Sequence, residues 1–171
     1  MQKSADRQIA YVALGSNLGD RHSTVLSALQ ELADIPCTRL RKASRLYETE
    51  PIGPAGQNHY INAVAELETC LSPAELLTHM QQIEYSFGRV RRKRWGARTL
   101  DLDIVLMGDG IIYTSTLTLP HPRFRERGFV LVPLAEIAPD AVDPVTGYTV
   151  ADLLEALDSG CSVIESEAAT I

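Results

Sequence analysis

The fold is organised around one stretch of sequence, Arg94-Trp95-Gly96-Ala97-Arg98-Thr99-Leu100-Asp101-Leu102-Asp103-Ile104-Val105-Leu106. The second half of this stretch predicts a β-strand, because leucine and isoleucine alternate with other residues and successive strand side chains point to opposite faces. Asp101 and Asp103 therefore leave the strand on the same face. Two carboxylates this close repel each other unless a cation lies between them, and Mg²⁺ takes oxygen ligands of this kind. The strand thus carries a candidate magnesium site.

A cluster of basic residues directly precedes this strand. Six of the 16 lysines and arginines fall between Arg89 and Arg98. A cationic loop that leads into paired carboxylates suits a polyphosphate with its metal ions, because metals neutralise some oxygens and arginines bind the rest. Taken alone, the aspartates favour the solvated face of an ordinary edge strand. The combination favours a phosphate site, because the apolar opposite face is expected to be buried.

Length and composition favour one globular domain. The chain has 171 residues, of which 45% are hydrophobic and 22% charged. We expect a single domain over residues 1–171, with its core at about 9–157 and a frayed tail at 158–171. The net charge of −6 and the pI of about 5.2 argue against a general nucleic-acid binder.

The cysteines and the apolar runs bear on the compartment. The chain has 3 cysteines without metal-site spacing, which favours free thiols in a reducing compartment over a disulfide framework. The first residues lack the apolar core of a signal peptide, and no apolar run approaches membrane-spanning length. We therefore expect a cytoplasmic protein without a membrane partner.

The order of predicted elements indicates the fold class. Strands are expected at 9–14, 37–48, 60–67 and 100–107, with a helix between Asp20 and Ile35 and a second helix that begins at the capping box Ser72-Pro73-Ala74-Glu75. This β-α-β-β-α-β order is the ferredoxin-like split arrangement of the α+β class, a mainly antiparallel sheet covered by helices. Helices at 130–137 and 150–157 form a C-terminal extension.

Several polar residues are candidates for ligand contacts. The segment Gly15–Asp20 reads as a glycine turn between a strand and a helix, which could receive phosphate or serve only as a turn. Tyr60 and Asn62 share a strand face and could offer a stacking ring and an amide. Gln81 and Glu84 lie away from the apolar face of the second helix, where solvent is the simpler expectation.

These motifs together resemble a known family. Leu14-Gly15-Ser16-Asn17-Leu18-Gly19, Tyr60-Ile61-Asn62-Ala63, Leu119-Pro120-His121-Pro122-Arg123 and above all Arg98-Thr99-Leu100-Asp101-Leu102-Asp103 are similar to the 6-hydroxymethyl-7,8-dihydropterin pyrophosphokinases of folate synthesis. The resemblance implies transfer of pyrophosphate from ATP to the pterin hydroxymethyl group, with release of AMP. Some members carry an arginine at the position of Thr116, so no ATP contact is carried over there.

The resemblance also implies site residues. Two Mg²⁺ ions are expected on Asp101 and Asp103, and these two residues with Arg89 and Arg98 form the expected catalytic set. The expected ATP contacts are Gln81, Glu84, Arg91, Trp95, Arg98, Ile104, Thr118, His121 and Arg127. The expected pterin contacts are Thr49, Pro51, Ile52, Gly53, Tyr60, Asn62, Trp95 and Phe129. Arg89 to Ala97 corresponds to a loop that is mobile in the family.

Three other function classes fit parts of the pattern. One is a non-catalytic regulatory domain, which would bind nucleotide without turning it over. A metal-dependent phosphohydrolase could use the same aspartate pair, and ferredoxin-like sheets can bind RNA through exposed aromatic residues. The chain has 6% aromatic residues and no strand with an aromatic and basic pattern, which disfavours nucleic acid. The expected partners are ATP and the hydroxymethyl-dihydropterin, and the expected state is a monomer.

Overall fold

A computed structural model describes residues 6–17, 19–49, 59–88, 100–157 and the backbone of 163–165. The helices and strands in chain order are β1 (Gln8–Ser16), α1 (Arg21–Ala33), β2 (Thr38–Ala43), β3 (Tyr47–Thr49), β4 (Tyr60–Thr69), α2 (Pro73–Ser86), β5 (Asp101–Met107), β6 (Ile112–Tyr113), β7 (Thr118–Leu119), the 3₁₀-helix η1 (Phe124–Glu126), α3 (Gly128–Ile137), α4 (Val150–Ala156) and β8 (Val163–Glu165). The expected α+β class is confirmed.

One antiparallel sheet forms the centre of the described structure. Its strand order is β5-β1-β4-β3-β8, and β2 also pairs with β4. Strand β1 is central, because it pairs with β4 along one edge and with β5 along the other. Strands β6 and β7 form a separate two-stranded ribbon.

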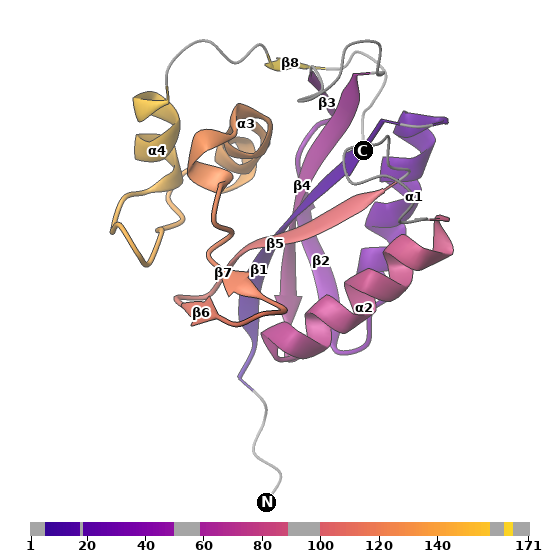
Figure 1. Ribbon diagram of the computed structural model, residues 1–171, viewed down its shortest axis with the longest axis horizontal. Coiled ribbons are helices and arrows are strands. Elements are labelled where there is room, and N and C mark those ends of the chain that lie inside the picture. Colours follow the sequence, from indigo (N-terminus) through magenta and orange to yellow (C-terminus); the bar gives the residue numbers. More distant parts are fainter. Residues whose placement is uncertain (1–5, 18, 50–58, 89–99, 158–162, 166–171) are drawn as a thin grey trace, which may run out of the picture.

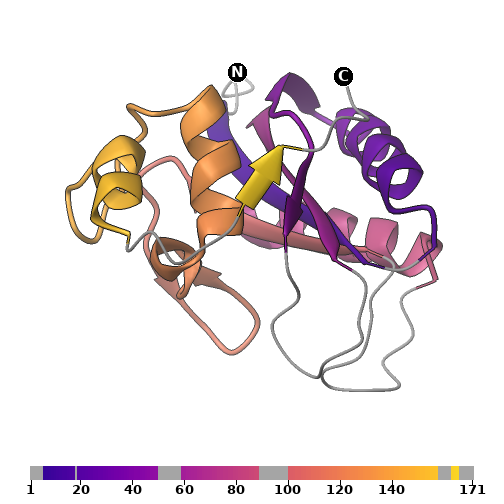
Figure 2. The same ribbon diagram turned by 90° about the horizontal axis from the view of Figure 1, so that it is seen from above.

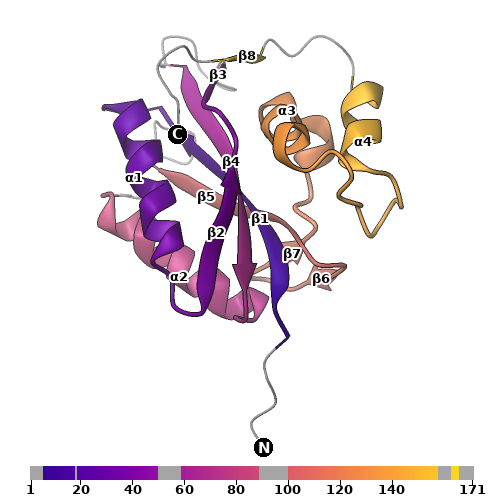
Figure 3. The ribbon, with the colours of Figure 1, turned by 180° about the vertical axis from the view of Figure 1, so that it is seen from behind.

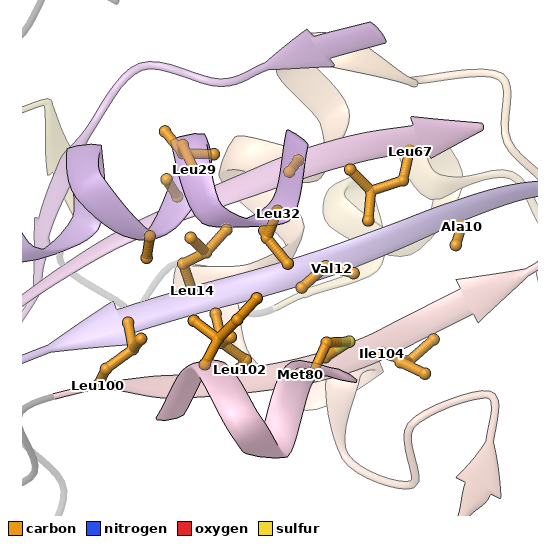
Figure 4. Close-up of a cluster of buried hydrophobic side chains, with 14 of the residues drawn as sticks. Ala10, Val12, Leu14, Leu29, Leu32, Leu67, Met80, Leu100, Leu102 and Ile104 are labelled. Atoms are coloured by element: carbon orange, nitrogen blue, oxygen red, sulfur yellow. The ribbon is translucent and has the colours of Figure 1, made fainter. Parts of the chain in front are cut away.

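Helices cover both faces of this sheet (Figures 1 and 3). Helices α1 and α2 lie on one face, where Val12 and Leu14 of β1 meet Leu32 of α1 and Met80 of α2 in one buried cluster (Figure 4). Helix α3 lies on the other face, and α4 packs against α3. The second cluster joins Val64, Val105 and residues of α3. Because apolar side chains of β1 and β4 point to both faces of the sheet, these two strands contribute to both buried clusters.

The helix starts follow the sequence signals. Asp20 caps α1 by accepting the backbone N–H of Ser23 at 3.2 Å. Ser72 and Glu75 form the expected capping box of α2, with Pro73 in the first turn. A second capping box, Thr149 with Asp152, begins α4. In each case a side chain satisfies a backbone N–H that has no partner within the helix.

The single strand expected at 37–48 is instead two strands. Strand β2 ends at Ala43 and β3 begins at Tyr47. Between them, the hydroxyl of Ser44 accepts the backbone N–H of Val64 at 2.9 Å, and Leu46 is buried. The Ser44 hydroxyl thus takes the place of a backbone carbonyl as the acceptor for Val64, while the Ser44 N–H still donates to the Val64 carbonyl at 2.8 Å. Hydrophobic alternation could not reveal this break.

The tail also departs from the expectation. Residues 158–171 were expected to fray, but Val163–Glu165 form β8, which pairs antiparallel with β3. Figure 2 shows β8 beside β3 and α3. The remainder of the tail lies outside the described residues.

A buried ion pair holds the segment between α3 and α4. Asp143 is fully buried and accepts hydrogen bonds from Arg125 Nη2 at 2.9 Å, from Thr146 Oγ1 at 2.7 Å and from the Val145 N–H at 3.0 Å. Burial raises the pKa of Asp143, but these hydrogen bonds and the Arg125 charge outweigh it and leave the pKa lowered. The charged carboxylate is therefore the form that stabilises this segment.

We predict that Asp143→Asn lowers the free energy of unfolding by about 1–3 kcal/mol at pH 7, because an amide cannot satisfy all the donors around it. A lowered folded-state pKa gives stability above the unfolded pKa and loses it as the pH falls through the folded pKa. The difference in the free energy of unfolding between wild type and variant should therefore disappear below about pH 4. Urea unfolding over this pH range measures the difference, with exposed Asp140→Asn as control. An equal difference at all pH values would contradict this account.

Candidate active site

The two aspartates lie on β5 as expected. Asp101 pairs with Gly15 of β1 and Asp103 pairs with Ala13, so both side chains leave the sheet on one face. Asp101 is partly buried and Asp103 is exposed. Leu102, between them, is buried on the opposite face with the α1 and α2 core. This confirms the expectation that the opposite face of the strand is apolar and buried.

Asn62 belongs to the same face two strands away. It pairs with Gly15 on one side and with Tyr47 on the other. Its amide Nδ2 donates to Thr49 Oγ1 at 2.6 Å, and both side chains are buried. Because directly paired residues share a face, Asn62, Gly15 and Asp101 form a row across three strands. Strand spacing places the Cα atoms of Asn62 and Asp101 roughly 10 Å apart.

Gly15 makes a close approach to Asn62 that the sequence analysis, which placed this glycine in a turn, did not identify. It was expected in a turn, but β1 continues to Ser16, so Gly15 lies within the sheet. A Cβ at this position would lie 2.9 Å from Asn62 Oδ1 and 3.6 Å from Tyr60 Cδ1. The absence of a side chain therefore leaves room for the Asn62 amide. A glycine within a strand often marks such a close approach. The sequence could have shown this signal if the predicted strand had been extended by two residues, to Ser16.

The two expected stacking rings come from different elements. Tyr60 begins β4 and pairs with Thr49, whereas Phe129 lies in the first turn of α3. Both are partly buried, and Phe129 packs against the α3 core. The guanidinium of Arg127 lies over the Phe129 ring, 5.4 Å from its centroid. This contact brings an expected ATP residue next to an expected pterin residue.

Glu84 is buried, contrary to the expectation that it faces solvent. Its side chain is 5% exposed, and Oε2 accepts the backbone N–H of Leu102 at 3.0 Å. The end of α2 packs against β5, so the buried face of the helix is wider there than its apolar residues indicate. Gln81, one turn earlier, is exposed as expected.

His121 lies near Asp103. Its backbone N–H donates to the Val105 carbonyl at 2.9 Å, which ties this segment to β5. Its Nδ1 accepts the N–H of Arg123 at 3.2 Å, so a neutral ring carries its proton on Nε2. Burial lowers the pKa of His121, the charges of Arg127 and Arg123 lower it further, and Asp103 opposes them. His121, Asp103 and Arg127 therefore act on one another electrostatically.

The remaining expected residues fall into two groups. Thr118 is partly buried in β7, whereas Ile104 is buried with the α1 and α2 core. The others lie outside the described residues, as does the expected mobile loop from Arg89 to Ala97; they are Arg89, Arg91, Trp95, Arg98, Pro51, Ile52 and Gly53.

The described residues contain no group of three or more histidine, cysteine or carboxylate side chains that could hold a metal ion. Asp101 and Asp103 supply a pair of oxygen ligands. Mg²⁺ is commonly bound through one or two carboxylates, with water and substrate phosphates as its other ligands. The donor set therefore fits magnesium that arrives with a nucleotide. In the described part of the chain, no helix is long and apolar enough to span a membrane.

Known structures share the fold. A chain of Plasmodium falciparum HPPK-DHPS, a triple mutant, aligns with a TM-score of 0.72 and 15% identity over 90% of this chain and 45% of that chain. A second structure, described as HPPK-DHPS in complex with substrates, gives a TM-score of 0.69 and 15% identity over 88% of this chain. This chain spans less than half of each, 45% and 43%. At such identities the likeness concerns the fold alone.

Sequence comparison identifies the family as well as the fold. The 2-amino-4-hydroxy-6-hydroxymethyldihydropteridine pyrophosphokinase of Haemophilus influenzae is 50% identical over 135 residues, which is 79% of this chain and 84% of that protein. The protein of the same name from Pseudomonas aeruginosa is 48% identical over 133 residues, 78% of this chain and 82% of that protein. Residues 11–139 match the family described as 7,8-dihydro-6-hydroxymethylpterin-pyrophosphokinase (HPPK). The chain belongs to this family.

Proposed function

We infer that this chain transfers pyrophosphate from ATP to the hydroxymethyl group of 6-hydroxymethyl-7,8-dihydropterin, giving AMP and the pterin diphosphate in folate synthesis. The observation that carries the inference is the row of Asn62, Gly15 and Asp101 across three strands. It offers a buried amide for the edge of a heterocycle and, from a residue two strands away, a carboxylate for the metal of a polyphosphate.

Pterin recognition is assigned to the β3–β4 end of this row. The Asn62 Oδ1 can accept from the pterin while its Nδ2 is held by Thr49 at 2.6 Å. Tyr60 and Phe129 would stack on the two faces of the ring, because one comes from the sheet and the other from α3. The resemblance adds Pro51, Ile52, Gly53 and Trp95, which the structure does not describe.

Nucleotide binding is assigned to the β5 end of the row. Asp101 and Asp103 would hold two Mg²⁺ ions, which offset the charge of the triphosphate and orient it for attack by the hydroxymethyl oxygen. His121 can donate from Nε2 to a phosphate oxygen, and Arg127 adds a positive charge on the same side. Gln81, Glu84, Thr118 and the Ile104 position are assigned to ATP on the resemblance, together with Arg89, Arg91 and Arg98.

We also propose the finer description of the fold. The element order and the strand order β5-β1-β4-β2 support a ferredoxin-like split β-α-β-β-α-β core with a C-terminal extension. One sheet supplies both buried clusters, which supports a single pyrophosphokinase domain over the whole chain.

The function is tested by incubating the chain with ATP, Mg²⁺ and 6-hydroxymethyl-7,8-dihydropterin and identifying the products. AMP with a pterin diphosphate is the expected result. ADP would indicate transfer of a single phosphoryl group, and inorganic phosphate formed without pterin would indicate a phosphohydrolase. Retention on RNA without turnover of ATP would indicate a nucleic-acid module. Each of these other results contradicts the inference.

We predict that Asp101→Asn and Asp103→Asn each lower turnover by at least about 10²–10³-fold, the usual effect of losing charge stabilisation at a transferred group. Both variants should fold, because the side chains are only partly buried or exposed. Turnover across a Mg²⁺ titration and the circular dichroism spectrum test the two statements. Asp109→Asn, an exposed acid just beyond β5, is the control. Turnover like that of wild type in either variant would rule out the metal assignment.

We predict that Gly15→Ala weakens pterin binding roughly 10- to 100-fold with little effect on ATP, because its Cβ would displace the Asn62 amide and leave polar groups unpaired. Separate calorimetric titrations measure the two affinities. Asn62→Ala should cause a similar loss, and the double variant should lose no more than Asn62→Ala alone. Additive losses would show that Gly15 acts by another route.

A further inference from the structure

Cys37 and Cys70 lie opposite each other at the ends of the neighbouring strands β2 and β4. Cys37 immediately precedes β2 and Cys70 immediately follows β4, where Thr38 pairs with Thr69. The Cys70 N–H donates to the Cys37 carbonyl at 3.0 Å, so the ladder continues one residue pair beyond the two strands. Hydrogen-bonded antiparallel pairs have Cα atoms about 5.5 Å apart, a usual separation for a disulfide.

The side chains of the two cysteines also interact. The hydroxyls of Thr38 and Thr69 are 2.7 Å apart, and the cysteines are the next pair along the ladder. A hydrogen bond with Cys37 is the largest cause of the raised pKa of the Cys70 thiol. Both thiols are reduced, Cys37 is exposed and Cys70 is partly exposed. A small oxidant in solvent can therefore reach this pair.

The backbone around the pair is fixed on both sides. Thr69 Oγ1 accepts the N–H of Leu71 at 3.1 Å, and Arg39 forms an ion pair with Glu68 at 2.8 Å, two residue pairs along the ladder from the cysteines. Cys37 has a φ of 55°, a left-handed conformation that turns the chain from α1 into β2. The paired strands thus hold the two cysteines at opposed positions.

We propose that Cys37 and Cys70 form a reversible intrachain disulfide when a hydroperoxide oxidises the protein. The exposed Cys37 thiolate attacks the peroxide oxygen, which yields a sulfenic acid and, with hydrogen peroxide, one water. The Cys70 sulfur then attacks the Cys37 sulfur, and the sulfenic oxygen leaves as a second water with the Cys70 proton. Two thiols are oxidised by two electrons, and one peroxide is reduced to two waters.

The bond lies far from the active site. In Figures 1 and 3 the start of β2 and the end of β4 lie together at the end of the sheet opposite β3. Eight residues along β4 separate Cys70 from Asn62, which is roughly 26 Å in an extended strand. The loop that the bond closes holds β2, β3 and β4, so it constrains the unfolded chain. Oxidation should raise stability without altering turnover.

The test uses the full chain with Cys161→Ser, because Cys161 lies outside the described residues. After hydrogen peroxide treatment, we expect the monomer to lose both titratable thiols and the mass of two hydrogens. A non-reduced digest should contain the Cys37–Cys70 cross-linked peptide, and dithiothreitol should restore both thiols. The thermal unfolding midpoint of the oxidised chain should rise, with turnover unchanged.

A matched control moves one thiol by one residue. Cys37→Ser with Thr38→Cys in the same background keeps the number of thiols but directs the second thiol to the opposite face of the ladder. Its cross-linking should be at least about tenfold slower, since disulfides need close and correctly directed Cβ atoms. Equal rates in the two proteins would overturn the proposal. Oxygen added to a single cysteine, or a disulfide only between chains, would also overturn it.

Discussion

The central strand β1 constrains everything built around it, because its two faces serve different purposes. Val12 and Leu14 point into the core under α1 and α2, whereas Ala13 and Gly15 face the side covered by α3. A shift of one residue in its pairing would exchange these faces. Pairing with β4 and with β5 fixes the register from both edges, and so fixes where Asn62 and Asp101 point.

The site occupies the part of the sheet that α3 leaves uncovered. Val64 and Val105 are buried beneath α3, but Asp103 on the same face is exposed. Helix α3 begins at Gly128, so Phe129 and the preceding Arg127 stand at the border between the covered and the open part. The same face thus changes from a packed core to a polar surface within a few residues, at the start of α3.

Patterns local in sequence were predictable, whereas contacts between distant segments were not. The aspartate strand and the capping box of α2 follow from alternation and capping chemistry, and the structure contains both. The burial of Glu84 depends on how closely α2 approaches β5, which the helix periodicity does not encode. The break after Ala43 depends on Ser44 meeting Val64, a residue 20 positions away. Gly15 is explained only by its neighbour Asn62 on another strand.

The free edge of β5 shows how such distant contacts position the site. Among the described strands, β5 stands at the end of the sheet order, so no described strand pairs with its outer backbone groups. The Glu84 carboxylate accepts the N–H of Leu102, and the His121 N–H donates to the Val105 carbonyl. Contacts from a helix and a loop therefore satisfy these two backbone groups of β5. Leu102 lies between the two aspartates, so the contact with Glu84 fixes the backbone from which both carboxylates project. Glu84 and His121, both proposed to contact ATP, thus also hold the strand that carries the two aspartates proposed to bind magnesium.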